Sequence, residues 1–209
     1  MNGKAANPRS ADWDIDSQFL DRWSPRAFAE EPLTEREIHT LFEAARWAPS
    51  CYNEQPWVFV YAAGEQERRR LCACLVPKNQ AWACRAPLLL FVLSRRRFRA
   101  GGRENRHAAF DAGAAWMALA LQARRLGLYA HAMAGFRLEE AIRLLGVSPE
   151  EWHVLAAVAV GRRGDPARLP EDLQAIESPN TRKPHDEVAV PLARWTAQAG
   201  RGDPPAAVS

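Results

Sequence analysis

The sequence predicts a mixed fold of helices and strands, α+β or α/β, built around one sheet. Strand-like and helix-like stretches alternate along the chain, which is typical of such domains. The 209 residues, of which 47% are hydrophobic, can fill one sizeable core. No internal repeat and no linker divides the chain. We therefore expect one domain, with polar segments at its ends.

The first half of the chain predicts two helices and a strand. A capping box formed by Thr34 and Glu37 precedes apolar residues at helical spacing, and Pro49 ends this pattern. The apolar run at 57–62 predicts a short buried strand. The stretch at 65–75 predicts a helix with a charged outer face.

The second half predicts three more strands and two more helices. Strands are expected at 87–94 and 154–161, a strand followed by a turn at 128–136, and helices at 108–126 and 138–145. The helix at 108–126 is apolar nearly all round, which favours burial on most of its sides, including against another chain. From residue 165 onward the chain is rich in proline and predicts an extended arm.

Charge and hydropathy exclude several classes of protein. A formal net charge of +3 suits an anionic small molecule but is too small to argue for nucleic acid. The first residues are polar and predict a flexible arm rather than a signal peptide. The apolar run at 87–93 is far too short for a membrane span. We expect neither a nucleic-acid nor a membrane partner.

The four cysteines are expected to be reduced thiols of a cytoplasmic protein. A zinc site made by Cys72, Cys74 and Cys84 is a second interpretation. The spacing of these three residues fits no usual zinc pattern, and no nearby histidine completes a ligand set. We therefore predict no metal site.

The sequence lacks the common motifs of catalysis by side chains and of nucleotide binding. The sequence contains no G-x-S-x-G elbow, no G-x-G-x-x-G loop, no P-loop and no pair of histidines at metal-binding spacing. No catalytic side chain is therefore predicted. If the chain is an enzyme, a bound cofactor performs the chemistry.

The stretch "RWSPRAF" at 22–28 is a candidate phosphate site. Arg22 and Arg26 can each donate forked hydrogen bonds to one phosphate, and Ser24 adds a hydroxyl. Pro25 stiffens the segment that presents them. A solvated charged turn is the alternative.

Two other stretches are candidates for contact with a ring. In "APSCYNEQPW" at 48–57, amide side chains can read the edge of a heteroaromatic ring, although an ordinary polar connection is the alternative. In "AHAMAGF" at 130–136, Gly135 permits close approach of the backbone to a ligand, and an ordinary strand-to-helix turn is the alternative.

In this order and spacing, these stretches resemble the nitroreductase family of FMN-dependent oxidoreductases. The N-terminal signature of that family runs arginine–x–serine–x–arginine or lysine–x–phenylalanine, here Arg22, Ser24, Arg26 and Phe28. It continues to a proline–serine–x–x–asparagine–x–glutamine–proline–tryptophan run, here residues 49–57. The stretches at 110–136 and 178–188 are similar to the central helix with its flavin-facing turn and to the C-terminal segment of the family.

The resemblance implies an architecture. It implies an α+β, three-layer α/β/α fold with a central mixed sheet, in an intertwined homodimer whose flavin sites lie at the subunit interface. Residues 16–190 would form the FMN-binding domain, between a flexible N-terminal arm at 1–15 and a C-terminal tail at 191–209.

The resemblance also implies which residues bind FMN. The residues at its phosphate would be Arg22, Ser24, Arg26 and, from the C-terminal arm, Arg182, with Trp23 also in the cofactor site. The residues that contact the flavin from the other subunit would be Pro49, Ser50, Asn53 and Gln55. Near the reactive N5 edge of the ring, the implied contacts are Asn79 and the backbone N–H groups of Ala134 and Gly135.

Several functions are compatible with this resemblance. The first passes hydride from NAD(P)H through the flavin to a nitroaromatic, quinone or similar acceptor in a ping-pong scheme. The second is a flavin-dependent dehydrogenase, a dehalogenase or a flavin-consuming enzyme with a specific metabolite. Arg162 or Arg163 is a candidate for contact with a nucleotide phosphate, and Cys51 is a candidate flavin-adjacent thiol. A non-enzyme alternative is a nucleic-acid patch on the basic loop at 95–103.

Overall fold

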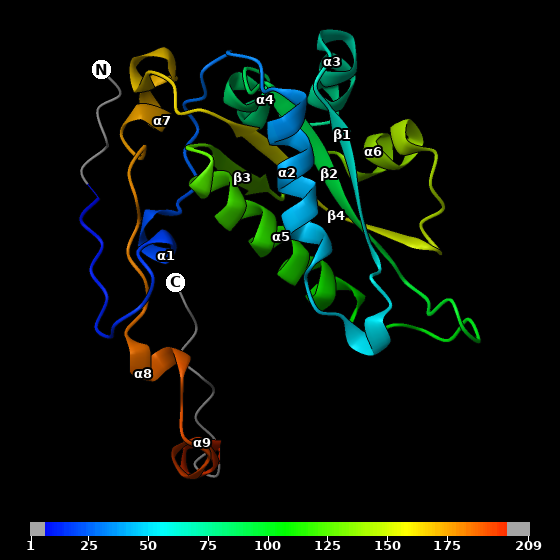
Figure 1. Cartoon of the computed structure of the whole chain (residues 1–209), viewed down its shortest axis with the longest axis vertical. Helices are drawn as coiled ribbons and strands as arrows, with labels where there is room; N and C mark the ends of the chain where they lie inside the picture. Colours follow the sequence, from blue (N-terminus) through cyan, green and yellow to red (C-terminus); the bar gives the residue numbers. More distant parts are fainter. Residues whose placement is uncertain (1–6, 200–209) are drawn as a thin grey trace.

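The fold is built on one four-stranded sheet with the strand order β1-β2-β4-β3 (Figure 1). The computed structural model describes residues 7–199. Its strands are β1 (Trp57–Ala62), β2 (Leu88–Arg95), β3 (Tyr129–Met133) and β4 (Trp152–Gly161). The α+β class predicted from the resemblance is thereby confirmed.

Within the described chain the sheet is antiparallel throughout, and the expectation of a mixed sheet is corrected. Each of the three neighbouring strand pairs is antiparallel. The register pairs Ala62, at the end of β1, with Leu89, at the start of β2. The helical connection between these strands therefore returns the chain to the end of the sheet that it left, which makes their pairing antiparallel.

Helices cover both faces of the sheet, so the expected three layers are present (Figure 1). Side chains of β2 alternate between two cores, with Leu90 in one and Phe91 in the other. One core is shared with α2 (Glu35–Arg46) and α5 (Ala108–Arg125). The other is shared with α3 (Glu65–Ala73), α4 (Pro77–Ala83) and α6 (Leu138–Leu145).

Local signals set the ends of several helices. Thr34 and Glu37 form the expected capping box at the start of α2, with the Glu37 N–H donating to Thr34 Oγ1 at 3.2 Å. Gly127 follows α5 with a φ of 74°, a left-handed conformation that favours glycine. These boundaries lie within a few residues of those predicted from the sequence.

Strand β1 is an edge strand, which corrects the expectation of a buried one. It pairs only with β2, and its residues Val58, Val60 and Tyr61 are exposed. The sequence "WVFVYA" is apolar at every position, so it carries no alternation that would distinguish an edge strand from a central one.

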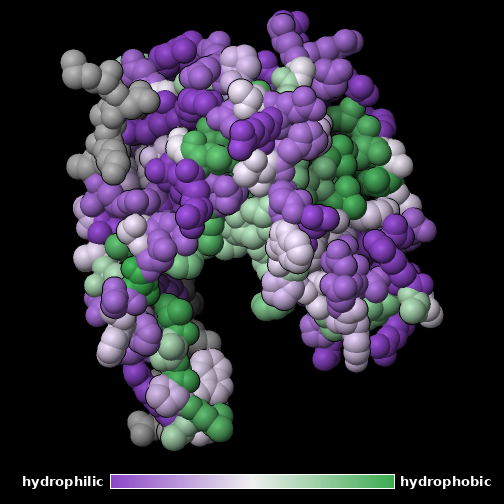
Figure 2. Space-filling view, viewed as in Figure 1, coloured by the Kyte–Doolittle hydropathy of each residue, from purple (hydrophilic) through white to green (hydrophobic). Residues whose placement is uncertain are grey.

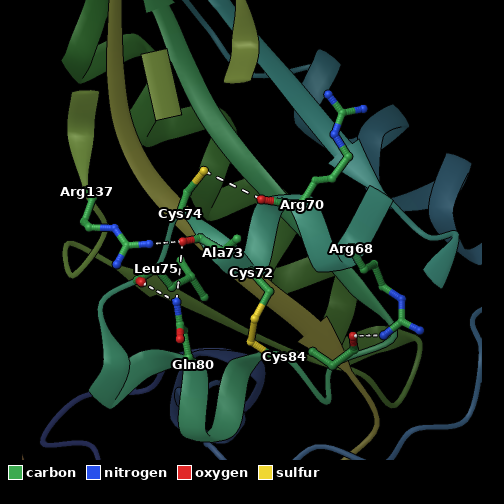
Figure 3. Close-up of a disulfide and its surroundings, with 10 residues drawn as sticks. Arg68, Arg70, Cys72, Ala73, Cys74, Leu75, Gln80, Cys84 and Arg137 are labelled. Carbon is green, nitrogen blue, oxygen red and sulfur yellow. Dashed lines mark hydrogen bonds between the residues drawn. A yellow bond between two sulfur atoms is a disulfide. The ribbon is translucent and has the colours of Figure 1, made fainter. Parts of the chain in front are cut away.

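The stretch predicted as one helix at 65–75 is followed by a second helix that the sequence reading missed. Helix α3 ends at Ala73, and α4 begins at Pro77, whose missing N–H suits the first turn of a helix. A disulfide between Cys72 and Cys84 joins the ends of these two helices, with a Cα–Cα distance of 5.5 Å (Figure 3).

The disulfide corrects the expectation that all four cysteines are reduced. Cys51 and Cys74 are free thiols. Disulfides are more usual in oxidising compartments, so the pair does not support the cytoplasmic location expected from the sequence. In residues 7–199, no three His, Cys, Asp or Glu side chains form a group that could hold a metal ion.

The chain ends form two arms on one side of the sheet (Figure 1). The N-terminal arm contains α1 (Gln18–Asp21), and a short turn, η1 (Cys51–Asn53), lies on the far side of the domain. The helices of the C-terminal arm are η2 (Pro166–Arg168), α7 (Glu171–Gln174), α8 (His185–Val188) and α9 (Leu192–Ala199). The expected extended arm thus contains short helices, and its first part is anchored by the buried side chains of Leu169 and Leu173.

The last part of this arm stands apart from the domain and carries apolar residues (Figure 2). Val188, Leu192 and Trp195 are all more than half exposed in the single chain. None of the helices in the described part of the chain is both long and apolar enough to cross a bilayer.

Reduction of the Cys72–Cys84 bond is expected to destabilise the fold. A disulfide that closes a loop of this length stabilises a protein by about 2–4 kcal/mol, and urea unfolding with and without dithiothreitol measures the loss. A Cys72→Ser, Cys84→Ser variant should show no effect of the reductant. Four reactive thiols in the unfolded, unreduced protein would contradict the pairing.

Candidate functional site

Residues 22–28, which we call the clamp segment, run as an irregular extended strip beside the sheet. Buried and half-buried positions alternate along it, so Arg22, Ser24 and Arg26 lie on its more open side. Trp23 is buried and packs edge-on against Tyr129 at 5.9 Å. The Trp23 indole therefore packs inside the protein, and the three residues predicted to bind phosphate lie on the open side of the clamp segment.

Distant side chains bind the backbone of the clamp segment. One oxygen of the buried Glu177 carboxylate accepts hydrogen bonds from the N–H groups of Arg26 and Ala27, both at 2.9 Å. His131 Nδ1 lies 2.9 Å from the Pro25 carbonyl oxygen. Because a carbonyl only accepts, this contact places the imidazole proton on Nδ1. Neither Glu177 nor His131 carries a local sequence signal for this role.

His131 is held neutral in this position. The pKa of its imidazole is lowered to about 4, chiefly by burial and also by the Arg26 guanidinium, against the opposing effect of the hydrogen bond to Pro25. The ring also packs on the Trp82 indole, with 4.6 Å between the ring centroids. The clamp segment therefore rests on an uncharged imidazole at neutral pH.

Three guanidinium groups gather beside the clamp segment: those of Arg9, Arg22 and Arg182, which we call the arginine cluster. Burial lowers the pKa of Arg22, and the Arg182 charge lowers it further. The pKa of Arg9 is lowered in the same way by burial, Arg182 and Arg22. Among the described residues, no carboxylate lies within ion-pair distance of these three side chains. The cluster is therefore a place where an anion is favoured.

Asn79 and Gly135 are in direct contact, as the resemblance implies for two residues of one site. Asn79 Nδ2 donates to the Gly135 carbonyl oxygen at 2.9 Å, and the N–H of Val76 donates to the same oxygen at 3.1 Å. A Cβ on Gly135 would lie 2.5 Å from Asn79 Nδ2, so only glycine fits without a shift. Ala134 beside it is exposed. We call residues 134–135 the glycine turn.

Helix α4 connects the glycine turn to the clamp segment. Helix α4 carries both Asn79 and Trp82, and Trp82 packs on His131, which binds the clamp segment. The N–H of Gly135 donates no hydrogen bond to any residue that the structure describes. This donor is therefore available to a ligand.

Residues 50–55, which we call the amide loop, are fixed in a strained conformation. The left-handed φ angles of Tyr52, Asn53 and Gln55 are 54°, 56° and 48°. Ser50 Oγ accepts the Gln55 N–H at 3.0 Å, and the Gln55 amide donates back to Asn53. Pro49 leads into this loop and is exposed.

A buried carboxylate that the sequence reading missed anchors the amide loop. Asp111, in the first turn of α5, is 3% exposed, and its Oδ2 accepts the Cys51 N–H at 3.1 Å. The free thiol of Cys51, a candidate flavin neighbour, is half-buried at this anchor.

Within one chain, the structure does not bring the amide loop to the arginine cluster. The loop is bound at Asp111, near the start of α5. The clamp segment lies near the helix's other end, where Arg124 stacks on Tyr129 at 3.9 Å and Tyr129 packs on Trp23. The thirteen helical steps from Asp111 to Arg124 span about 20 Å, and Figure 1 shows η1 and α1 on opposite sides of the domain.

The remaining candidate arginines are engaged by other groups. Arg162 pairs with Glu37 at 2.7 Å and with Glu31 at 3.5 Å, so its charge is already balanced. The Arg163 guanidinium lies over the Trp23 ring at 5.5 Å. In the basic loop, Arg103 lies over the Phe98 ring at 5.1 Å. These contacts weaken the nucleotide-phosphate and nucleic-acid interpretations.

Comparison with known proteins places this fold among flavin-containing oxidoreductases. A crystal structure described as an oxidoreductase containing FMN superposes with a TM-score of 0.85 at 40% identity, over 90% of this chain and 96% of that one. The sequence profile of the nitroreductase family matches residues 20–75 and 74–162. The chain belongs to the nitroreductase family, and the predicted resemblance is confirmed.

Two bacterial relatives with the provisional name NADH dehydrogenase/NAD(P)H nitroreductase are more distant. The protein of Streptomyces coelicolor is 26% identical over 71% of this chain and 82% of its own length. The protein of Rhodopseudomonas palustris is 28% identical over 37% of this chain, and the match spans only 40% of that relative.

Acid is expected to destabilise the fold through His131. Its pKa is lower in the folded protein than the value of about 6.5 in the unfolded chain, so its contribution is fully present above pH 6.5 and is lost as the pH falls toward 4. At pH 5 the loss amounts to about 2 kcal/mol. Urea unfolding at pH 8 and pH 5 measures it, with His131→Gln as the matched variant. Equal pH dependence in both proteins would contradict the assignment.

Proposed function

We propose that the chain binds FMN between the arginine cluster and the glycine turn and acts as an FMN-dependent oxidoreductase. The observation that carries this proposal is the arginine cluster, whose three cations have no carboxylate partner among the described residues. Family membership and the 40% identical relative that contains FMN support it.

The residues present fit this cofactor. A phosphate dianion complements guanidinium groups that are close together, and hydrogen bonds to charged groups contribute about 1.5–3 kcal/mol each. At the other end of the site, Gly135 offers a backbone N–H that donates to no described residue and could donate to a flat ring. Asn79 fixes the orientation of this turn through the Gly135 carbonyl group.

FMN, when bound, supplies hydride transfer between NAD(P)H and an acceptor, which we propose is a nitroaromatic, a quinone or a similar compound, in a ping-pong scheme. The names of the relatives support NAD(P)H as the donor. The chain itself binds the cofactor and orients it: Arg22 and Arg182 bind the phosphate, and the Gly135 N–H donates to the ring. A dehydrogenase, a dehalogenase or a flavin-consuming enzyme with a specific metabolite is the second candidate.

We also propose that two copies of the chain form each site. The amide loop is bound at Asp111, and the clamp segment lies near Arg124, about 20 Å further along α5. We therefore infer that the amide loop at each cofactor comes from a second copy. Large apolar side chains near the amide loop are open in the single chain. Phe110 of α5 is 80% exposed, and Tyr52 of the loop itself is 81% exposed.

The purified protein should be yellow, with flavin absorption that bleaches when NADPH or NADH is added without oxygen. The loss of Arg22 alone should weaken FMN binding about 10- to 150-fold, so Arg22→Ala, Arg182→Ala should purify folded and colourless. Arg143→Ala removes an exposed arginine on α6 and should keep its flavin. Full FMN occupancy in the double variant would rule out this phosphate site. Bound flavin that neither coenzyme bleaches would favour the second candidate function.

Light scattering should give a mass of twice the 23.4 kDa chain. Placing a charge at the open face of α5 with Phe110→Glu should shift the protein toward a monomer, because the carboxylate would have to be desolvated. Leu138→Glu, on the opposite layer, should leave the mass unchanged, since Leu138 lies on α6. A monomer mass for the unaltered protein at micromolar concentration would contradict the shared site.

A further inference from the structure

Arg9 lies in the N-terminal segment that the sequence predicts to be a flexible arm, yet it is tightly bound. Its Nε donates to the Asn180 carbonyl oxygen at 2.8 Å, and its Nη2 donates to Asn180 Oδ1 at 2.7 Å. Its Nη1 donates to the carbonyl oxygens of Arg22 at 2.7 Å and Leu20 at 3.2 Å. One side chain thus joins the N-terminal segment, the clamp segment and the C-terminal arm.

The same contacts connect Arg9 to both proposed phosphate ligands. It binds the backbone of Arg22 directly. It reaches Arg182 through Asn180, whose Oδ1 also accepts a hydrogen bond from Arg182 Nη1 at 2.9 Å. Asn180 belongs to the C-terminal arm, 171 residues from Arg9 in the sequence. Without Arg9, the backbone carrying Arg22 and the arm carrying Arg182 would lose this bridge.

Arg9 differs from the groups that would bind an anion directly, because most of its N–H donors already bind oxygens of the protein. A guanidinium has five N–H donors in a fixed fork. Four hydrogen bonds of Arg9 go to oxygens of the protein. All of these acceptors are uncharged amide oxygens, so Arg9 keeps its full positive charge while its geometry is fixed.

We propose that Arg9 is a positioning residue of the phosphate site, which fixes the Arg22 backbone and Asn180 so that Arg22 and Arg182 face one anion. This inference rests on the proposed FMN site. Its physical basis is that three like charges repel one another, so the free side chains would move apart in solvent. The fork of Arg9 holds their supports together before the anion arrives, which lowers the ordering cost of binding.

The test compares the binding of FMN and of riboflavin, which has the same ring and ribityl chain but no phosphate. The Kd of each for the flavin-free protein is measured by fluorescence quenching in the unaltered protein, Arg9→Ala and Arg9→Lys. Arg143→Ala serves as the control for loss of an exposed cation. We expect Arg9→Ala to weaken FMN binding about tenfold and to leave riboflavin binding within about twofold.

Arg9→Lys separates positioning from charge. Lysine keeps the charge but lacks the fork, so the proposal expects it to lose nearly as much FMN affinity as alanine. Restoration of FMN affinity by lysine would show that charge alone matters and would overturn the positioning role. Equal losses for FMN and riboflavin would mark Arg9 as a general structural residue, and unchanged binding would remove it from the site. Either result would also overturn the proposal.

Two further measurements keep the test decisive. If Arg9→Ala does not fold, Asn180→Ala removes the side-chain oxygen shared by Arg9 and Arg182 and should give the same selective loss of FMN affinity. Equal affinity of the unaltered protein for riboflavin and FMN would mean that the phosphate site itself is wrong. That outcome is visible before any variant is made, so failure of the proposed function is distinguishable from failure of the role of Arg9.

Discussion

The repulsion among the guanidinium groups of Arg9, Arg22 and Arg182 is the constraint that organises the site. Like charges at close range oppose folding, and here Arg9 and Arg182 bind neutral oxygens, chiefly those of Asn180, rather than carboxylates. Neutral acceptors satisfy the donors without cancelling the charge, so the cluster stays attractive to an anion. Arg162 shows the opposite arrangement, because Glu37 and Glu31 balance its charge and leave it a structural role.

The clamp segment depends on side chains from distant parts of the chain. Over most of its length no neighbouring strand of the described chain forms hydrogen bonds with its backbone. Such contacts begin only at Ala27, which accepts the Gly164 N–H, and at Phe28, which pairs with Arg163 in an isolated bridge. Glu177 and His131 therefore supply the missing acceptor and donor. The Glu177 carboxylate binds backbone N–H groups of this segment, and the imidazole of His131 is neutral. The segment is thus ordered by two side chains that reach it from distant parts of the chain.

The sequence predicts the features that are encoded locally. Capping at Thr34, apolar runs and glycine residues at helix ends place the main strands and helices within a few residues, and Asn79 contacts Gly135 as the resemblance implies. The features that were missed depend on contacts between distant residues. The bonds of Arg9 to Asn180 and of Glu177 to Arg26 cross 171 and 151 positions. No local pattern reveals which polar side chain will meet which backbone group at that distance.

The amide loop has a defined conformation within the single chain, before two copies associate. Three residues with left-handed φ angles cost about 1–3 kcal/mol each, and such a loop persists only when its surroundings define it. Ser50 and the buried Asp111 bind this loop from within the same chain. In the proposed dimer, each copy would therefore bring a preformed amide wall to a preformed arginine cluster. Binding would then require two rigid surfaces to meet, and little of the binding free energy would be lost to ordering the loop.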